Sequence, residues 1–272
     1  FVFINIIPIQ IYSMIKPDPI ILYNTFIGAM TGAAVMVFIA LYFVKAGYGK
    51  FNAKQWGRTI SNRTAWVVME APICLLMIVF WLCSKRTFSP APLAICLLFE
   101  LHYVQRTFIF PFLMRGKGKM SLAVMSMGFF FNVANAFMQG YWIFFLSPDD
   151  LYTPSWLMNP KFIIGTLLFL LGFVINIDSD RRIRHLRTPG DTSYYLPHGG
   201  MYDYVTSANY FGELIEWLGF AILTWSVPGL VFFIWTFANL VPRSDAIYKF
   251  YKEKFPIEMQ GKNLKRIFPF IY

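Results

Sequence analysis

The chain carries too few charged residues to cover a surface that faces water. Only 14% of its 272 residues are Asp, Glu, Lys or Arg, whereas 57% are hydrophobic and 30 are Phe. A soluble domain of average composition is about 25% charged. We therefore predict an all-α integral membrane protein. Its apolar runs lie at 20–44, 65–83, 91–113, 121–146, 161–177 and 210–241.

The last apolar run is too long for a single transmembrane helix, because about 20 apolar residues suffice to cross the hydrocarbon layer. Pro228 and Gly229 interrupt this run, and such a pair typically separates two helices. The sequence therefore predicts seven transmembrane helices. Six remains the alternative number, since the run at 161–177 is the shortest and leads directly into a polar segment.

The basic residues are distributed as expected for a protein that crosses the membrane seven times. Of the 24 Lys and Arg residues, 19 fall in segments that would share one side of the membrane, at 45–64, 114–120, 178–209 and 242–272. Lys and Arg concentrate in cytoplasmic loops, so we expect a cytoplasmic C-terminus. The membrane would be the endoplasmic reticulum in a eukaryote and the inner membrane in a bacterium. We attribute the net charge of +10 to this topology and expect no nucleic-acid partner.

Ionisable side chains inside the apolar runs are candidates for function, because a charge in a membrane is costly. Tyr103 and Arg106 are three residues apart and would share a helix face, as would two of the glutamates. The alternative is structural pairing between helices, which we favour for Glu100. The candidates are Glu70, Glu100, Arg106, Glu213 and Glu216.

The polar segment at 176–209 mixes arginines, asparagines and tyrosines. Arginine and amide donors suit a pyrophosphate, and tyrosine rings can stack on a flat ring. The alternative is an ordinary basic loop. The glycine-rich dinucleotide fingerprint is missing. The three Cys and three His are scattered without the spacing of metal ligands, so we predict no metal site.

Several long motifs occur in a fixed order between the apolar runs. They are TAWVVMEAP, LHYVQRTF, MQGYW, LGFVINIDSD, LRTPGDTSYYLPHGGMYDYV and SANYFGELIEWLGFAILTWS. With these motifs the chain resembles the steroid 5α-reductases (3-oxo-5α-steroid 4-dehydrogenases), from about Ala46 to the terminal IFPFIY. Residues 1–18 lie outside the resemblance and are predicted to be an N-terminal extension or interfacial segment. Residues 19–272 would form one reductase domain.

The resemblance implies a seven-helix membrane enzyme in which cytoplasmic loops cover a pocket for NADPH. It implies that Glu70 and Tyr103 hold the ketone of a steroid-like substrate. Two positions depart from relatives, since Met69 stands where a Gln is frequent and Tyr195 where an Arg is frequent. The cofactor-binding set implied by the resemblance is Arg106, Asn176, Asp180, Arg187, Tyr194, Asn209, Glu213 and Tyr251.

The implied reaction is hydride transfer to the carbon 4–carbon 5 double bond of a 3-keto-4-ene steroid. Such a transfer needs a donor at the ketone oxygen, which takes up negative charge. Tyr103 would be the main acid. Glu70 would orient it, or donate directly if protonated, and the sequence does not separate these roles. The preference for NADPH over NADH rests on the resemblance, and we expect a monomer.

Two other functions remain open at this point. One is a related reductase acting on a polyprenol or an enoyl thioester with the same cofactor. The other is a non-catalytic sterol-binding membrane protein or transporter, although the repeated halves typical of transporters are not visible in the sequence.

Overall fold

The computed structural model describes residues 18–44, 56–115, 118–188, 191 and 193–272. Outside this part lie most of the predicted extension at 1–18, the AGYGK motif at 46–50, the basic residues Lys45, Lys50, Lys54 and Lys117, and three residues of the 186–205 motif. The described chain is mostly helical. Its elements are α2 (Pro19–Phe43), β1 (Thr59–Ser61), α3 (Asn62–Cys83), α4 (Pro90–Val104), η3 (Gln105–Ile109), α5 (Phe110–Leu113), β2 (Lys119–Ser121), α6 (Leu122–Ala136), η4 (Phe137–Leu146), η5 (Pro154–Met158), α7 (Pro160–His185), η6 (Gly200–Asp203), α8 (Ala208–Thr224), α9 (Val227–Lys254) and α10 (Pro256–Met259).

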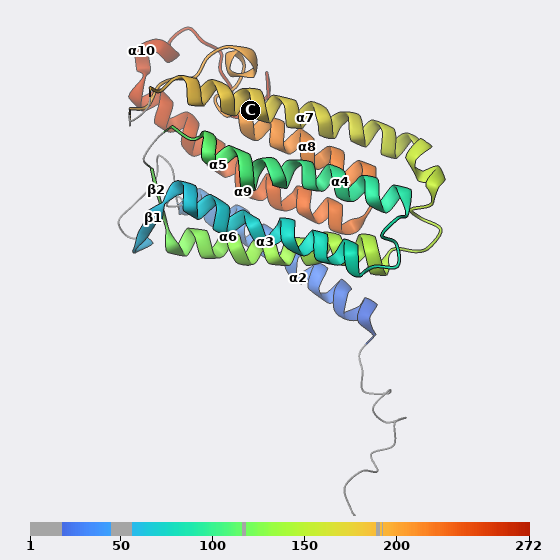
Figure 1. The fold of residues 1–272 in the computed structure, drawn as a ribbon. Coiled ribbons are helices and arrows are strands. Elements are labelled where there is room, and N and C mark those ends of the chain that lie inside the picture. Colours follow the sequence, from blue (N-terminus) through green and yellow to red (C-terminus); the bar gives the residue numbers. More distant parts are fainter. Residues whose placement is uncertain (1–17, 45–55, 116–117, 189–190, 192) are drawn as a thin grey trace, which may run out of the picture.

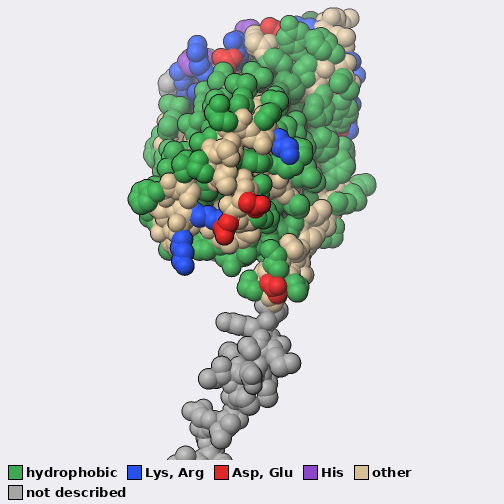
Figure 2. Space-filling model, turned by 90° about the vertical axis from the view of Figure 1, so that its right-hand side faces the viewer, with side chains coloured by type: hydrophobic (Ala, Val, Ile, Leu, Met, Phe, Trp, Pro, Cys, Tyr) green, Lys and Arg blue, Asp and Glu red, His purple; other side chains and the backbone are tan. Residues whose placement is uncertain are grey.

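Long helices run roughly alongside one another and form an elongated bundle (Figure 1). Within the described residues, five helical stretches are long and apolar enough to cross a membrane, at Pro19–Phe43, Asn62–Cys83, Pro90–Leu113, Leu122–Leu146 and Pro160–His185. Hydrophobic side chains cover most of the face in Figure 2, and large ones such as Phe130 are exposed. The protein is therefore an integral membrane protein. The helices α8 and α9 are not among the five, so the number seven stays a prediction.

The predicted break near residue 228 separates α8 from α9. Trp225 ends α8 in the left-handed conformation, with a φ of 46°. The Ser226 side chain then accepts a hydrogen bond from the Gly229 backbone nitrogen at 3.1 Å. Pro228 lies in the first turn, where its missing N–H leaves no helical bond unmade. The interpretation of the 210–241 run as two helices is confirmed.

Helix α7 extends well beyond the apolar run that predicted it. The run ends at residue 177, but the helix continues to His185. The first part of the polar segment at 176–209 is therefore helical, and its alternative interpretation as an ordinary basic loop was wrong there. Asp178 and Arg182 form an i,i+4 ion pair of 2.6 Å, which favours the added turns. The extension places Asn176 and Asp180 on one face of α7.

Helices α7 and α8 pack backbone against backbone. Cβ atoms added at Gly172 or Gly165 would overlap the α8 backbone at Glu216 and Leu223, and one at Gly212 would overlap the α7 backbone at Asn176. Small residues allow this close approach in membrane bundles. The contact sets the α7 side chains against those of α8, where the polar cluster described below is found.

A two-stranded antiparallel sheet joins the starts of α3 and α6. Strand β1 pairs with β2 through Thr59 opposite Ser121 and Ser61 opposite Lys119. Ser61 and Ser121 then cap their helices, each accepting a bond from a backbone nitrogen three residues later. The sheet therefore aligns the two helices. It lies at the same end of the bundle as α10 and the C-terminal part of α9 (Figure 1).

Candidate active site

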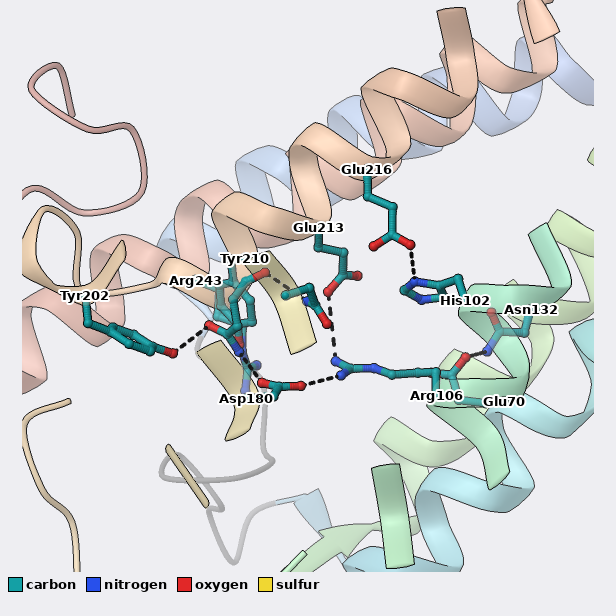
Figure 3. Close-up of polar contacts among 12 residues, drawn as sticks. Glu70, His102, Arg106, Asn132, Asp180, Tyr202, Tyr210, Glu213, Glu216 and Arg243 are labelled. Atoms are coloured by element: carbon teal, nitrogen blue, oxygen red, sulfur yellow. Dashed lines mark hydrogen bonds and ion pairs between the residues drawn. The ribbon is translucent and has the colours of Figure 1, made fainter. Parts of the chain in front are cut away.

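Arg106 lies at the centre of a buried polar cluster (Figure 3). Its side chain is 9% exposed, and Nη1 donates a hydrogen bond of 2.9 Å to Asp180 Oδ2. Nη2 lies 3.9 Å from Glu213 Oε2. The guanidinium carbon lies over the rings of Trp66 and Phe110, at 4.7 and 4.4 Å. A buried cation needs such partners, because an unpaired charge inside a protein is strongly destabilising.

Asp180 links Arg106 to the start of α8. Its second oxygen, Oδ1, accepts from Asn209 Nδ2 at 3.1 Å. Asn176 donates to the backbone oxygen of Asn209 at 2.9 Å. Five of the eight predicted cofactor residues thus form one connected group: Arg106, Asn176, Asp180, Asn209 and Glu213.

The other three predicted cofactor residues lie near the C-terminal ends of α7 and α9. The Arg187 guanidinium carbon lies 4.8 Å from the centre of the Tyr194 ring. That ring meets Phe250 edge-on, with centroids 5.5 Å apart. Tyr251 is 6% exposed and packs in the same apolar cluster as Phe250. A partly exposed guanidinium and two tyrosines therefore gather at this end of the bundle.

Tyr195, noted in the sequence as a departure from the family resemblance, is bonded to an acidic residue of the same connection. Its hydroxyl donates to Asp191 Oδ2 at 2.9 Å, and Asp191 Oδ1 accepts from the Ser193 nitrogen at 2.8 Å. The bonds from Ser193 and Tyr195 lower the pKa of the exposed Asp191 carboxyl. Tyr195 therefore forms a local contact with Asp191.

Glu70 on α3 and Tyr103 on α4 are 8% and 4% exposed. Each receives a hydrogen bond from an amide of α6. Asn132 Nδ2 lies 3.0 Å from Glu70 Oε2, and Asn135 Nδ2 lies 3.3 Å from the Tyr103 hydroxyl. No hydrogen bond joins Glu70 to Tyr103 in the described part of the chain. The α6 amides, which the sequence analysis did not single out, are the direct partners of both residues.

His102 also escaped the sequence analysis, which considered the histidines only as possible metal ligands. It is 3% exposed, and its Nδ1 lies 2.8 Å from Glu216 Oε1. Glu216 Oε2 has no hydrogen-bond partner among the described residues. The sequence could have indicated both residues, because His102 adjoins Tyr103 and Glu216 lies one helical turn from Glu213. Glu100, expected to pair structurally, accepts from the Cys74 thiol of α3 at 3.1 Å.

Comparison with known proteins decides the family. A family model described as 3-oxo-5-alpha-steroid 4-dehydrogenase matches residues 118–272, more than half of the chain. The chain is 37% identical to the mouse (Mus musculus) 3-oxo-5-alpha-steroid 4-dehydrogenase 1 over 240 residues, which cover 88% of this chain and 92% of that protein. The chain belongs to the 3-oxo-5-alpha-steroid 4-dehydrogenase family.

Relatives in this family come from both plants and animals. Identity with the Arabidopsis thaliana steroid 5-alpha-reductase DET2 is 36% over 240 residues, or 86% of this chain and 90% of that protein. Identity with the Homo sapiens 3-oxo-5-alpha-steroid 4-dehydrogenase 1 is 40% over 227 residues, or 83% and 86%. The resemblance recognised in the sequence is confirmed.

Members of the 3-oxo-5-alpha-steroid 4-dehydrogenase family are oxidoreductases acting on a CH–CH bond, and this activity implies a nicotinamide cofactor. The donors near Arg106 fit such a group. Guanidinium and amide N–H groups bind phosphate and ribose oxygens, and the tyrosines near Arg187 offer ring faces. Ser207 Oγ, beside Asn209, is buried without a hydrogen-bond partner in the described residues and could bond a ligand. The described part of the chain contains no group of three potential metal ligands.

Proposed function

We propose that this protein reduces the carbon 4–carbon 5 double bond of a 3-keto-4-ene steroid, with NADPH as the reductant. The printed names of its relatives support the substrate class. The observation that supports this proposal most directly is the placement of Glu70 and Tyr103, two buried polar side chains from different helices. Tyr103 also lies three residues from Arg106 at the start of the cofactor cluster.

The nucleotide would be held by the Arg106 group together with Arg187, Tyr194 and Tyr251. When bound, the reduced nicotinamide would supply a hydride to carbon 5 of the steroid, and a proton taken up from water after the hydride transfer would be added at carbon 4 to complete the saturation. Asn176, Asp180 and Asn209 would bond ribose and amide groups. The guanidinium groups would pair with phosphate oxygens, for which bidentate arginine donors are well suited.

Tyr103 would donate a hydrogen bond to the ketone oxygen and stabilise the negative charge that develops there. Glu70 would lie beside the same oxygen and would either orient Tyr103 or, if protonated, donate directly to the ketone. The apolar walls around these two residues would exclude water from the steroid. Removing one donor of this kind costs about a hundred- to a thousandfold in rate.

Two features support a seven-span arrangement with a cytoplasmic C-terminus and a single domain at 19–272. The sheet, α10 and the ends of α7 and α9 lie at one end of the bundle, where most basic segments begin (Figure 1). The α8–α9 turn returns the chain to that end. A hydrophobic substrate would enter from the bilayer, and the anionic cofactor from the basic, loop-covered end. The protein would act as a monomer in the endoplasmic reticulum or the bacterial inner membrane.

The test is NADPH oxidation by the purified protein in lipid nanodiscs. A panel would contain 3-keto-4-ene steroids, an enoyl thioester and a polyprenol aldehyde, with mass spectrometry of the products and NADH as the comparison. We expect a 5α-reduced steroid and faster turnover with NADPH. Turnover confined to the thioester or polyprenol would assign the protein to a different reductase. Binding of steroid without nucleotide oxidation under any condition would indicate a binding protein.

A further inference from the structure

Three amide side chains follow one face of the α6–η4 helix. Asn132, Asn135 and Gln139 are spaced three and four residues apart, and they are 5%, 0% and 1% exposed. Burying an amide in an apolar interior is unfavourable unless its groups are hydrogen-bonded. We call these three residues the α6 amide series. All of their contacts described below cross to other helices or to one another.

The direction of the hydrogen bonds in the series is fixed at one end by a backbone carbonyl. Gln139 lies 2.9 Å from the Pro228 oxygen, which can only accept, so Gln139 must present its Nε2 there. The same Nε2 lies 3.2 Å from Asn135, which must therefore present its Oδ1. Asn135 Nδ2 is then left to face the Tyr103 hydroxyl at 3.3 Å.

This direction determines what the Tyr103 hydroxyl can do. A phenol has one hydrogen to donate and can also accept. Because Asn135 donates to the Tyr103 oxygen, the phenol hydrogen is free to point at a different acceptor. If the Asn135 amide were reversed, its oxygen would capture that hydrogen.

Asn132 acts on the Glu70 carboxyl group in the same way. Its Nδ2 lies 2.8 Å from the Met69 backbone oxygen, another obligate acceptor, and 3.0 Å from Glu70 Oε2. The orientation of Asn132 is therefore also set by a carbonyl. Met69 itself contributes no side-chain amide, so the amide donor beside Glu70 comes from α6.

We propose that the α6 amide series consists of positioning residues for the reduction. Asn135, held in one orientation by Gln139 and the Pro228 carbonyl, makes Tyr103 a hydrogen-bond donor toward the substrate ketone. Asn132 fixes the carboxyl group of Glu70 beside it. This inference rests on the proposed function, because it assigns Tyr103 and Glu70 to the ketone. The alternative is that the amides only hold helices together, as polar side chains do in many membrane bundles.

The directional test is Asn135→Asp, which keeps the shape and replaces the Nδ2 donor by an oxygen acceptor. We expect single-turnover reduction to fall about a hundredfold, the effect of losing one donor to the developing charge. The Kd for NADPH should stay within about twofold, because none of the hydrogen bonds described for the series reaches a predicted cofactor residue. Thr236→Val is the matched control. It removes a buried hydrogen-bond donor elsewhere, the Thr236 hydroxyl, whose bond of 3.1 Å runs to the backbone of its own helix, and it should leave turnover unchanged.

A spectroscopic measurement distinguishes an effect on the orientation of the Tyr103 hydroxyl from a general loss of protein stability. The absorption of a conjugated enone shifts to longer wavelength when its oxygen accepts a hydrogen bond. In the complex with oxidised nucleotide, where no reduction occurs, wild type should show this shift for a bound 3-keto-4-ene steroid. Asn135→Asp should bind the steroid and lose the shift. If Asn135→Asp does not fold, Gln139→Leu tests the same point, because it releases Asn135 to rotate and should weaken both shift and turnover.

Wild-type turnover and an unchanged shift in these variants would overturn the proposal. Equal losses of turnover, NADPH affinity and thermal midpoint, with the shift retained, would assign the series to helix packing and would also overturn it. A different result would reject the proposed function itself. A wild-type protein that binds nucleotide but reduces no steroid enone would reject that function before any variant is compared.

Discussion

Asp180 and Arg106 form a buried ion pair across two helices, with Oδ2 accepting from Nη1 at 2.9 Å and both side chains less than 10% exposed. The pair joins the end of the Tyr103 helix to the part of α7 that extends beyond its apolar run. Because each charge lacks water, each depends on the other. The two sides of the candidate active site are therefore connected electrostatically.

Asp180→Asn should weaken NADPH binding and destabilise the protein. Removing one partner of a buried pair leaves the other charge uncompensated, at a cost of about 3–5 kcal/mol. Glu213, at 3.9 Å, is too distant to replace the bond to Asp180. Nucleotide titration and thermal unfolding measure the two effects. The control is Asp178→Asn, which removes a carboxylate from an ion pair on the same helix whose side chains are 38% and 40% exposed. Similar losses in both variants would contradict the prediction.

Tyr103→Phe should lower single-turnover reduction by about a hundred- to a thousandfold while NADPH still binds. The ring and its packing remain, and only the hydrogen-bond donor is lost. Rapid mixing with steroid and prebound nucleotide measures the rate. Tyr152→Phe provides the comparison, because that buried hydroxyl bonds the Thr224 backbone oxygen at 2.8 Å, away from the site. Turnover close to wild type in Tyr103→Phe would refute the assignment.

Glu70→Gln should nearly abolish turnover without loss of NADPH binding. The amide can donate a hydrogen bond but cannot transfer a proton to the ketone oxygen, and its own oxygen can still accept from Asn132 at the position of Oε2. The matched change is Glu100→Gln on the neighbouring helix, where the carboxylate accepts from Cys74 and takes no part in the proposed reaction. Steady-state kinetics of both variants, with a nucleotide Kd for each, make the test. An active Glu70→Gln enzyme would rule out this role.

Gly172→Ala should destabilise the α7–α8 contact. The added Cβ would overlap the backbone of Glu216, and crowding of this kind costs about 1–3 kcal/mol. Thermal unfolding in detergent should show a lower midpoint. Gly28→Ala on α2 is the control, since a Cβ there meets nothing within 4 Å, and alanine is the better helix former by about 0.5–1 kcal/mol. A midpoint for Gly172→Ala at or above that of Gly28→Ala would contradict the packing argument.

Acid should loosen the C-terminal segment through Asp245, which lies beyond the apolar part of α9. Arg266 Nε and Lys249 Nζ lie 2.5 and 2.6 Å from its oxygens. Partial burial raises the pKa of Asp245, but the bonds from Lys249 and Arg266 outweigh it and leave the pKa below its usual value. A carboxyl with a lowered folded-state pKa stabilises the fold above the unfolded value, about 3.9 for Asp, and this contribution disappears as the pH falls through the folded pKa.

Thermal midpoints measured from neutral pH down to about pH 3 test this prediction, since that interval includes the ordinary range of Asp titration. Asp245→Asn should be less stable at neutral pH and should lose part of the acid dependence. Asp150→Asn, at an exposed aspartate in the connection before η5, is the control. Parallel pH curves for wild type and Asp245→Asn would disprove the role of the ion pairs.

The sequence predicted local features well, because they depend on neighbours along the chain. Pro228 and Gly229 marked the α8–α9 break, and the spacing of Tyr103 and Arg106 predicted their shared helix. The length of α7 was underestimated, because hydropathy detects the membrane boundary and not the end of a helix that continues into water. Helix-favouring ion pairs such as Asp178–Arg182 carry it further.

Partners between distant helices could not be predicted in this way. Nothing local relates Asn132 to Glu70 or His102 to Glu216, since each pair forms only when helices pack. The family resemblance provided candidate roles for residues but no hydrogen-bond partners. The three amides are nevertheless visible in the sequence as a polar stripe in an apolar run. Such a stripe indicates a polar contact between helices, as the buried glutamates do.

The glycine contact between α7 and α8 should make this side of the bundle stiffer than the side formed by α3 and α6. Backbones in direct contact leave little room to slide, so we expect Asp180 and Asn209 to keep their spacing when different lipids bind. Helices α3 and α6 meet instead through flexible side chains, with Met69 lying against Gly128. We expect changes in lipid preference to arise from substitutions on α3 and α6, with nucleotide affinity left as it is.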